Sequence, residues 1–221
     1  MKKLSVFLFV MLFFFGITGI ANATLWDRGN GLIYDDVLDI TWLQDTSYAR
    51  TSGYIETLPY YISYGQIHWP QAMTWADQLT YGGYDDWRLP SALNSDGSGP
   101  DGGYLAGSEM GHMFYNNLGG SSLSFPGSDF IDGYGNNVSF QNLLPEMYWS
   151  ENDENARWPY FAWGFYFNHG SLSDSNKTAI YGNAWAVRDG DVSVSVPEPA
   201  TMLLLFSSLI GLAGFRKKFK K

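Results

Sequence analysis

The sequence predicts an α+β domain in which two helices pack on short antiparallel strands and long loops join the elements. Three observations predict this class. Short apolar runs with glycine-rich turns occupy both ends of the central region, two segments with helical apolar spacing lie between them, and no repeat unit recurs along the chain. The chain also lacks cysteine, which excludes a disulfide scaffold, a thiolate metal site and a cysteine nucleophile.

Three short strands are predicted at the start of the central region, at residues 25–27, 32–34 and 40–43. Glycine and asparagine at residues 29–31 separate the first two. A turn of this composition between apolar runs indicates a β-hairpin. We therefore expect the fold to begin with antiparallel pairing.

Two helices are predicted next. Pro70 opens the first, which ends before a pair of glycines. Its apolar face has the spacing i, i+3, i+4 and i+7 and consists of Ala72, Trp75, Ala76 and Leu79. The second helix spans residues 108–118 and has Ser108 as its N-cap. Its apolar face consists of Met110, Met113, Phe114 and Leu118.

Residues 119–142 are predicted as a loop because glycine, serine and asparagine dominate them. Strands are predicted again at residues 148–150, 162–167 and 184–188, the last two with alternating side chains. A period of two is typical of antiparallel strands with one face on a core.

The N-terminus has the layout of a secretory signal peptide. Two lysines precede an apolar run at residues 6–17, and Ala21 and Ala23 stand at the small-residue positions of a cleavage site. We therefore expect signal peptidase to remove residues 1–23. A membrane anchor is the alternative, but the apolar run is shorter than the about 20 residues that a span needs.

The C-terminus combines Pro197, Glu198 and Pro199 with an apolar run at residues 200–215 and a final cluster of basic residues. This arrangement resembles the PEP-CTERM sorting signal. The resemblance implies transient anchoring in the inner membrane of a Gram-negative bacterium through a short helix, followed by cleavage near Pro-Glu-Pro by an exosortase. A permanent anchor is the alternative, since a short span is tolerated at modest cost.

The chain is thus predicted to comprise a signal peptide at residues 1–23, a globular domain at 24–196 and a sorting signal at 197–221. Its 221 residues include 13 Lys or Arg and 22 Asp or Glu, a formal charge of −9. Seven bases lie in the two end signals, so six bases and all 22 acids remain between Thr24 and Glu198, a charge of −16. This charge argues against nucleic acid as a partner. It also favours neutral glycans, or acidic ones bridged by calcium, over free polyanions.

The most specific motif of the globular domain is the run Asp86, Trp87, Arg88, Leu89 and Pro90. It is accompanied by segments at residues 32–35, 40–43, 75–76, 148–150 and 186–188. Their types and order resemble the Lcl C-terminal domain family, which takes its name from a collagen-like bacterial adhesin. The resemblance implies a fold similar to that of C-type lectins.

We interpret this signature motif as structural. Arg88 lies among many acids, with which it can form a bidentate, partly buried ion pair. Pro90 followed by Ser91 suits a turn or a helix start.

Residues 94–108 form a predicted glycine-rich loop in which Asp96, Ser98 and Asp101 are candidate calcium ligands. Calcium prefers oxygen ligands on flexible loops, and a solvated turn is the alternative. No other cofactor is expected, because the three histidines lack metal-binding spacing. Glu146 with residues 151–153 resembles the sugar and calcium site of C-type lectins, although the usual motifs of that site are absent.

No catalytic residue is predicted, since the chain has no nucleophile elbow, phosphate loop or metal-binding motif. Aromatic side chains could instead stack on sugars. The candidates are Tyr148, Trp149 and Trp158, together with Tyr60, Tyr61, Tyr64 and Trp69 in predicted loops. We therefore expect a non-enzymatic module of the cell surface or extracellular matrix that associates with exopolysaccharide or a surface glycan. A structural matrix protein without a ligand pocket and a carbohydrate-active enzyme with paired carboxylates are the alternatives.

Overall fold

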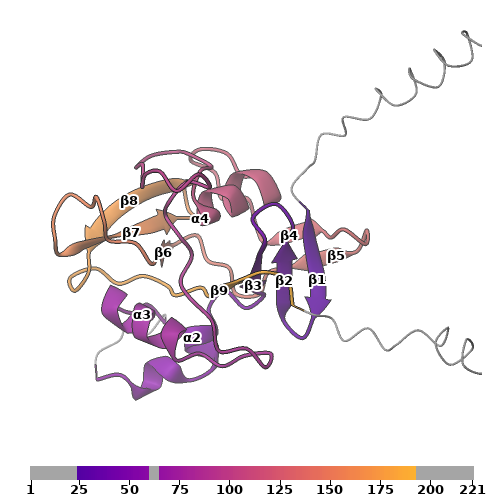
Figure 1. Ribbon diagram of the computed structural model, residues 1–221, viewed down its shortest axis with the longest axis horizontal. Helices are drawn as coiled ribbons and strands as arrows, with labels where there is room; N and C mark the ends of the chain where they lie inside the picture. Colours follow the sequence, from indigo (N-terminus) through magenta and orange to yellow (C-terminus); the bar gives the residue numbers. More distant parts are fainter. Residues whose placement is uncertain (1–23, 60–64, 193–221) are drawn as a thin grey trace, which may run out of the picture. The chain divides into compact units, whose positions relative to one another are not determined.

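A computed structural model describes residues 24–59 and 65–192 (Figure 1). The chain divides into two compact units, Met1–Asp191 and Val192–Lys221, and the described part of the first unit forms the folded domain. The predicted signal peptide and sorting signal lie outside the described residues, as do Tyr60, Tyr61 and Tyr64.

The first sheet has four antiparallel strands in the order β1-β2-β3-β9. The strands are β1 (Leu25–Gly29), β2 (Leu32–Asp35), β3 (Ile40–Leu43) and β9 (Val187–Asp189). The predicted hairpin is confirmed, because Trp26 pairs with Tyr34 across the turn between β1 and β2. β9 joins the edge of β3, where Trp42 pairs with Val187, so the two ends of the domain meet in one sheet (Figure 1).

The second sheet contains β6 (Met147–Trp149), β7 (Phe161–Tyr166) and β8 (Ser171–Asn176), again antiparallel. The hairpin β4 (Asp129–Ile131) and β5 (Asn137–Ser139) forms a third, two-stranded sheet. Residues 119–142 were predicted as a loop, and this is wrong for the hairpin. Only Phe130 among its paired residues is buried, so the segment has little apolar signal.

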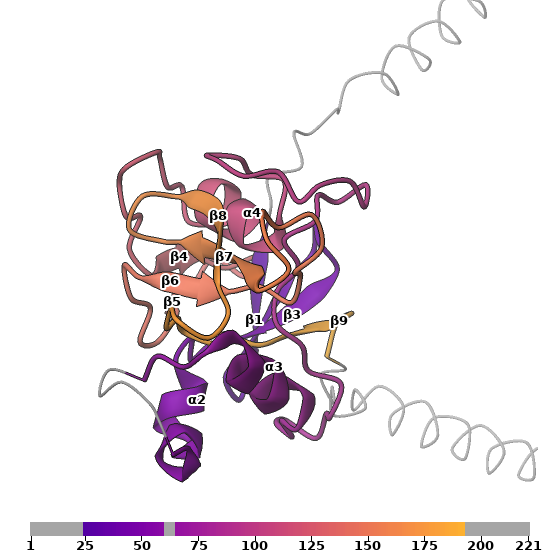
Figure 2. The same cartoon turned by 90° about the vertical axis from the view of Figure 1, so that its left-hand side faces the viewer.

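Two longer helical segments and two single turns complete the domain. The predicted first helix is confirmed as α3 (Trp69–Asp77), which buries Ala72, Trp75 and Ala76, but it ends before Leu79, which was predicted on the same face. The second is confirmed as α4 (Glu109–His112) continued by the π-helical turn η2 (Met113–Asn117). The short α2 (Tyr48–Thr51) and the 3₁₀ turn η1 (Tyr54–Thr57) precede them. Figures 1 and 2 agree that α2 and α3 lie on one side of the strands and α4 on the other.

Aromatic side chains fill the core between these elements. The fully buried aromatic residues are Trp42, Phe114, Tyr148, Trp149, Phe165, Phe167 and Trp185. Trp185 connects the two larger sheets, since its ring centroid lies 4.5 Å from that of Trp42 in β3 and 5.9 Å from that of Tyr148 in β6. A large aromatic side chain buries about 150–250 Å², so such a core stabilises a domain that has no disulfides.

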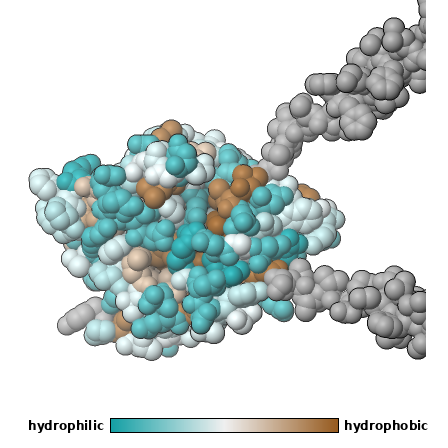
Figure 3. Space-filling view, in the orientation of Figure 1, coloured by the Kyte–Doolittle hydropathy of each residue, from teal (hydrophilic) through white to brown (hydrophobic). Residues whose placement is uncertain are grey.

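The structure thus confirms the α+β class with mostly antiparallel strands. One detail differs, because β7 is buried on both faces from Ala162 to Phe165, where one buried face was predicted. No helix within the described part of the chain is long and apolar enough to cross a membrane. The face drawn in Figure 3 is largely hydrophilic, with apolar side chains in separate patches, as suits an acidic domain.

Candidate functional site

The signature motif forms part of the scaffold. Trp87 and Leu89 are buried, and the backbone of Arg88 exchanges two hydrogen bonds with Val187, of 2.8 and 2.9 Å. This pairing attaches the motif to the beginning of β9. The helix start considered at Ser91 is absent, because residues 91–94 form no regular helix.

Arg88 makes the predicted bidentate, partly buried ion pair. Its Nη1 and Nη2 atoms donate to the two carboxylate oxygens of Glu109 over 2.9 and 2.7 Å. Asp189 and the carbonyl oxygen of Leu89 accept from the remaining guanidinium N–H groups. All five donors of a guanidinium therefore have partners within the protein. Burial alone would lower the pKa of Arg88, but the hydrogen bonds and charge of Glu109 outweigh it and the pKa is raised.

A second arginine, Arg188, pairs with the acidic residue of the motif, Asp86. Asp86 accepts two hydrogen bonds of 2.8 Å from Arg188 in β9, and this pairing lowers the pKa of Asp86. The two arginines thus bind carboxylates from different segments. Local patterns in the sequence do not identify these partners, because Asp86 and Arg188 lie 102 positions apart.

A cleft of about 490 Å³ opens beside Arg88. Its charged lining consists of Arg88, Glu109, Glu151 and Asp189, and its apolar side chains are Val37, Leu38 and Leu93. Arg88 donates its guanidinium N–H groups to Glu109, Asp189 and Leu89. A ligand in the cleft therefore meets mainly hydrogen-bond acceptors on its charged side.

Glu151 is the carboxylate of this cleft that forms no ion pair with a residue in the described part of the chain. Its backbone N–H donates to Pro90, whereas its carboxylate receives no hydrogen bond from the residues that the structure describes. Burial raises the pKa of Glu151, the charge of Arg88 opposes this shift, and the nearby carboxylates of Glu109 and Asp189 add to it. The neighbouring Asn152 is buried and accepts hydrogen bonds from Ser91 and Ala92, which is a structural role.

The three candidate calcium ligands lie in one loop, but they already have protein partners. Asp96 accepts from the backbone N–H of Ser98 over 2.9 Å, and hydrogen bonds from Ser98 lower the pKa of Asp96. The amide of Asn94 donates to Ser98 over 3.0 Å and to Asp101 over 3.1 Å. Within residues 24–59 and 65–192, no three His, Asp or Glu side chains are grouped to hold a metal ion. Calcium binding here stays a prediction.

The structure contradicts the prediction that Tyr148 and Trp149 stack on a ligand, because both rings are fully buried. Their polar atoms also have internal partners. The hydroxyl of Tyr148 accepts from the N–H of Leu144, and the indole N–H of Trp149 donates to the carbonyl oxygen of Ile67. β6 is covered on both faces, so its aromatic residues belong to the core.

Trp69 was predicted to lie in a loop, and this is also wrong. It begins α3, its indole N–H donates to the carbonyl oxygen of Ser150, and the ammonium nitrogen of Lys177 lies 4.8 Å from its ring centroid. Trp69 therefore joins α3 to the residues that directly follow β6 and β8.

Trp158 is half exposed, as a ligand-stacking residue must be, and Tyr160 lies beside it. The exposed fractions are 50% and 54%. The two ring planes differ by 5° and their centroids are 6.2 Å apart. Parallel rings at this distance are displaced sideways, so each keeps part of its face open. Tyr160 was not predicted as a ligand-stacking residue, although two aromatic residues flanking Pro159 in a polar segment could have indicated the pair.

The protein holds this aromatic pair in place. The N–H of Phe161 donates to the carbonyl oxygen of Trp158, and the ring of Phe161 packs edge-on against Tyr160 at 5.3 Å. Lys177 donates from its backbone to Tyr160 and from its ammonium group to Pro159, each over 3.0 Å. The pair is therefore attached to the first residue of β7 and to the residue that follows β8.

Comparison with known proteins identifies one segment of the chain. Residues 195–218 match the PEP-CTERM protein-sorting motif, which confirms the C-terminal sorting signal. No curated protein and no solved structure matches the chain. The motif marks an exported protein that an exosortase processes and that reaches the cell surface or the medium. Membership in the Lcl C-terminal domain family stays a prediction.

Proposed function

We propose that the protein is a non-enzymatic module of the cell surface or extracellular matrix, which binds glycan chains through the Trp158–Tyr160 pair. The observation that carries this proposal is the parallel, half-exposed arrangement of the two rings on an exported domain. Aromatic faces are the surfaces on which the C–H side of a sugar ring packs. Two rings displaced by about one sugar length suit consecutive units of an extended chain.

The fixed position of the rings supports this proposal. Hydrogen bonds from Phe161 and Lys177 hold the backbone on both sides of Pro159. A surface ordered before binding loses less conformational entropy when a ligand arrives, which favours affinity. By contrast, a purely structural matrix protein has no need of two large aromatic side chains half open to solvent.

The Lcl resemblance adds a proposal about the fold. We infer that the domain is C-type-lectin-like, with the signature motif as its scaffold. The pairing of Arg88 with Val187 and the ion pairs from Arg88 to Glu109 and from Arg188 to Asp86 support this role, because they connect the middle of the chain to β9 and α4.

A carbohydrate-active enzyme is the second candidate, because three carboxylates line one cleft. The bonding pattern favours binding over catalysis. Glycosidases need two carboxyl groups free to act on the substrate, whereas Arg88 binds both oxygens of Glu109 and one oxygen of Asp189. Only Glu151 is left without such a partner. Release of reducing sugar that Glu151→Gln abolishes would establish the enzyme instead.

We further propose that the protein belongs to a Gram-negative bacterium and passes through an inner-membrane-anchored intermediate after removal of its signal peptide. The confirmed sorting motif supports this route. Blocking the exosortase should leave the uncleaved chain in the membrane fraction, whereas secretion at the normal rate without an exosortase would contradict it.

A retention assay tests the glycan proposal. The exported protein, purified from its producer, is passed over that organism's immobilised exopolysaccharide. We expect wild-type protein to be retained and the variant Trp158→Ala/Tyr160→Ala to pass through the column unbound. Tyr104→Ala is a matched control, since Tyr104 is similarly exposed but lies in another loop. Equal retention of all three proteins would contradict a role for the aromatic pair.

A further inference from the structure

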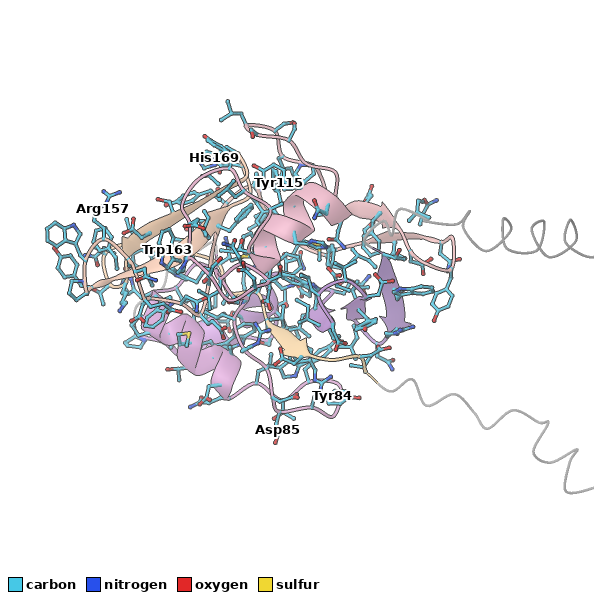
Figure 4. All side chains as sticks on the ribbon, turned by 45° about the horizontal axis from the view of Figure 1, so that its top comes forward. Tyr84, Asp85, Tyr115, Arg157, Trp163 and His169 are labelled. Carbon is cyan, nitrogen blue, oxygen red and sulfur yellow. The ribbon has the colours of Figure 1, made fainter. Side chains whose placement is uncertain are left out.

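The aromatic pair has a cation beside it. Arg157 directly precedes Trp158, and its side chain is 70% exposed. Figure 4 shows this side chain projecting away from the ribbon at the end of the domain where β7 and β8 lie. An exposed positive charge therefore lies in the same turn as the two exposed aromatic residues.

The guanidinium group of Arg157 forms one long ion pair and donates no hydrogen bond to the residues that the structure describes. Its Nη2 atom lies 3.8 Å from Oδ1 of Asp174, which is beyond hydrogen-bond distance, and the other oxygen of Asp174 accepts the backbone N–H of Arg157. The other cations that form ion pairs in the described part of the chain are more enclosed. Arg28, Arg88, Lys177 and Arg188 each donate hydrogen bonds to a carboxylate, and their side chains are at most 26% exposed.

Resting on the proposed function, we propose that the Trp158–Tyr160 pair selects glycans that contain uronic acid, whose ring stacks on the aromatic faces while its carboxylate binds Arg157. A guanidinium group presents two parallel N–H donors that match the two oxygens of a carboxylate. Neutral sugars can make the stacking contact, but they have no carboxylate to accept these two parallel hydrogen bonds.

The overall charge of the domain does not decide this choice. At physiological ionic strength the screening length is about 8 Å, so distant carboxylates act weakly on a ligand at Arg157. Of the carboxylates near the pair, Asp153 is bound to the ammonium group of Lys177, and Asp174 is almost fully buried beneath Arg157. The exposed carboxylate of Glu154 accepts hydrogen bonds from the side chain of Asn152 and the backbone of Asp153. Contact with the exposed guanidinium can therefore outweigh the long-range repulsion that the sequence suggests.

Three tetrasaccharides separate charge from stacking. Titration calorimetry of the exported protein would use tetragalacturonate, its fully methyl-esterified form and cellotetraose. The ester keeps the sugar ring but removes its charge. We expect wild-type protein to bind the acid about fivefold or more tightly than the ester, a factor that suits an exposed charge-assisted pair.

Variants of Arg157, Trp158 and Tyr160 show which side chain produces the preference for the acid over the ester. Arg157→Gln should bind acid and ester equally, with the affinity for the ester unchanged, and Arg157→Lys should recover part of the preference. Trp158→Ala/Tyr160→Ala should lose both ligands. Because Arg157 is exposed, its variants should melt at the wild-type temperature.

Three kinds of outcome would overturn the inference in distinguishable ways. Equal binding of acid and ester by wild-type protein, or a preference that survives in Arg157→Gln, would remove the uronic acid selection and leave glycan binding intact. Failure of wild-type protein to bind any of the three tetrasaccharides would count against both this inference and the proposed function. A sulfated neutral tetrasaccharide bound as tightly as the acid would show a general anion contact and contradict the carboxylate assignment.

Discussion

Arg88 binds Glu109 through two parallel hydrogen bonds of 2.9 and 2.7 Å, and this pair joins the signature motif to the first residue of α4. Glu109 also accepts the backbone N–H of Ser91 over 2.7 Å. One carboxylate thus satisfies the arginine of the motif and a backbone group of the residue that follows the motif. Loss of Arg88 would leave the partly buried charge of Glu109 without compensation.

Replacing Arg88 should destabilise the domain. Arg88→Gln removes the charge that neutralises Glu109, and we expect the free energy of unfolding to fall by about 2–3 kcal/mol. Arg88→Lys keeps the positive charge but loses the two parallel N–H donors, so we expect the free energy of unfolding to fall by about 1–2 kcal/mol. Urea unfolding measures both, with the exposed Asp85→Asn as a control expected to stay within about 0.5 kcal/mol. A wild-type value for Arg88→Gln would mean that the pair is unimportant for stability.

Glu151 should make stability depend on pH. Its pKa is raised in the folded protein because burial disfavours the charged carboxylate. The folded state therefore holds this proton more tightly than the unfolded state does. The stability from this group is complete below the unfolded pKa near 4.3 and is lost as pH rises through the raised folded value.

The variant Glu151→Gln should lack this loss, so it should gain stability relative to wild type as pH rises from about 4 to 8. Urea unfolding at a series of pH values checks this, and the exposed Glu146→Gln serves as the control for the substitution itself. A constant difference between Glu151→Gln and wild type over the series would refute the assignment.

His112 should act in the opposite direction. Burial lowers its pKa, although the charge of Asp35, 3.8 Å from Nε2, opposes the shift. The stability from neutral His112 is complete above the unfolded pKa near 6.5 and falls as pH drops toward the lowered folded value. His112→Gln should therefore lose less stability than wild type between about pH 7 and 5.5. A larger loss in the variant would show that His112 gains its proton on folding.

Calcium should stabilise the loop that contains Asp96, Ser98 and Asp101 if these residues bind it as predicted. Calcium near its dissociation constant, at millimolar concentration, would add about 0.4 kcal/mol and raise the melting temperature by about 1–2 °C. Asp101→Asn should abolish the increase, and magnesium at the same concentration is the ionic control. An unchanged melting temperature of the wild-type protein with calcium or with chelator would rule the site out.

Local patterns in the sequence predicted much of the fold. The spacing of Trp75 and Ala76 located α3, and Ser108 located the start of α4, where its hydroxyl accepts the N–H of Gly111. β8 was missed because only Leu172 and Ser175 are buried in it, which is too few for a pattern. Its register depends on pairing with β7, which a local pattern does not contain.

The candidate site was less predictable, because exposure and pairing depend on the assembled fold. Trp149 and Trp158 are the same residue type nine positions apart, yet one lies in a covered strand and the other in an exposed turn. Arg88 was correctly assigned a bidentate partner, but its actual partner is 21 positions away on α4. Composition predicts that such contacts exist, whereas tertiary structure decides which atoms make them.

If the aromatic pair binds the glycan, a bound glycan must cover Trp158. Fluorescence quenching measures how accessible the Trp158 side chain is to the quencher. Trp158 is the most exposed tryptophan of the described chain, so acrylamide should quench its fluorescence preferentially. We predict that saturating exopolysaccharide reduces this quenching in the wild-type protein and in Tyr104→Ala, and that Trp158→Phe shows no such change. Quenching of the wild-type protein that stays the same with bound polysaccharide would contradict the claim that this aromatic pair is the glycan-binding surface.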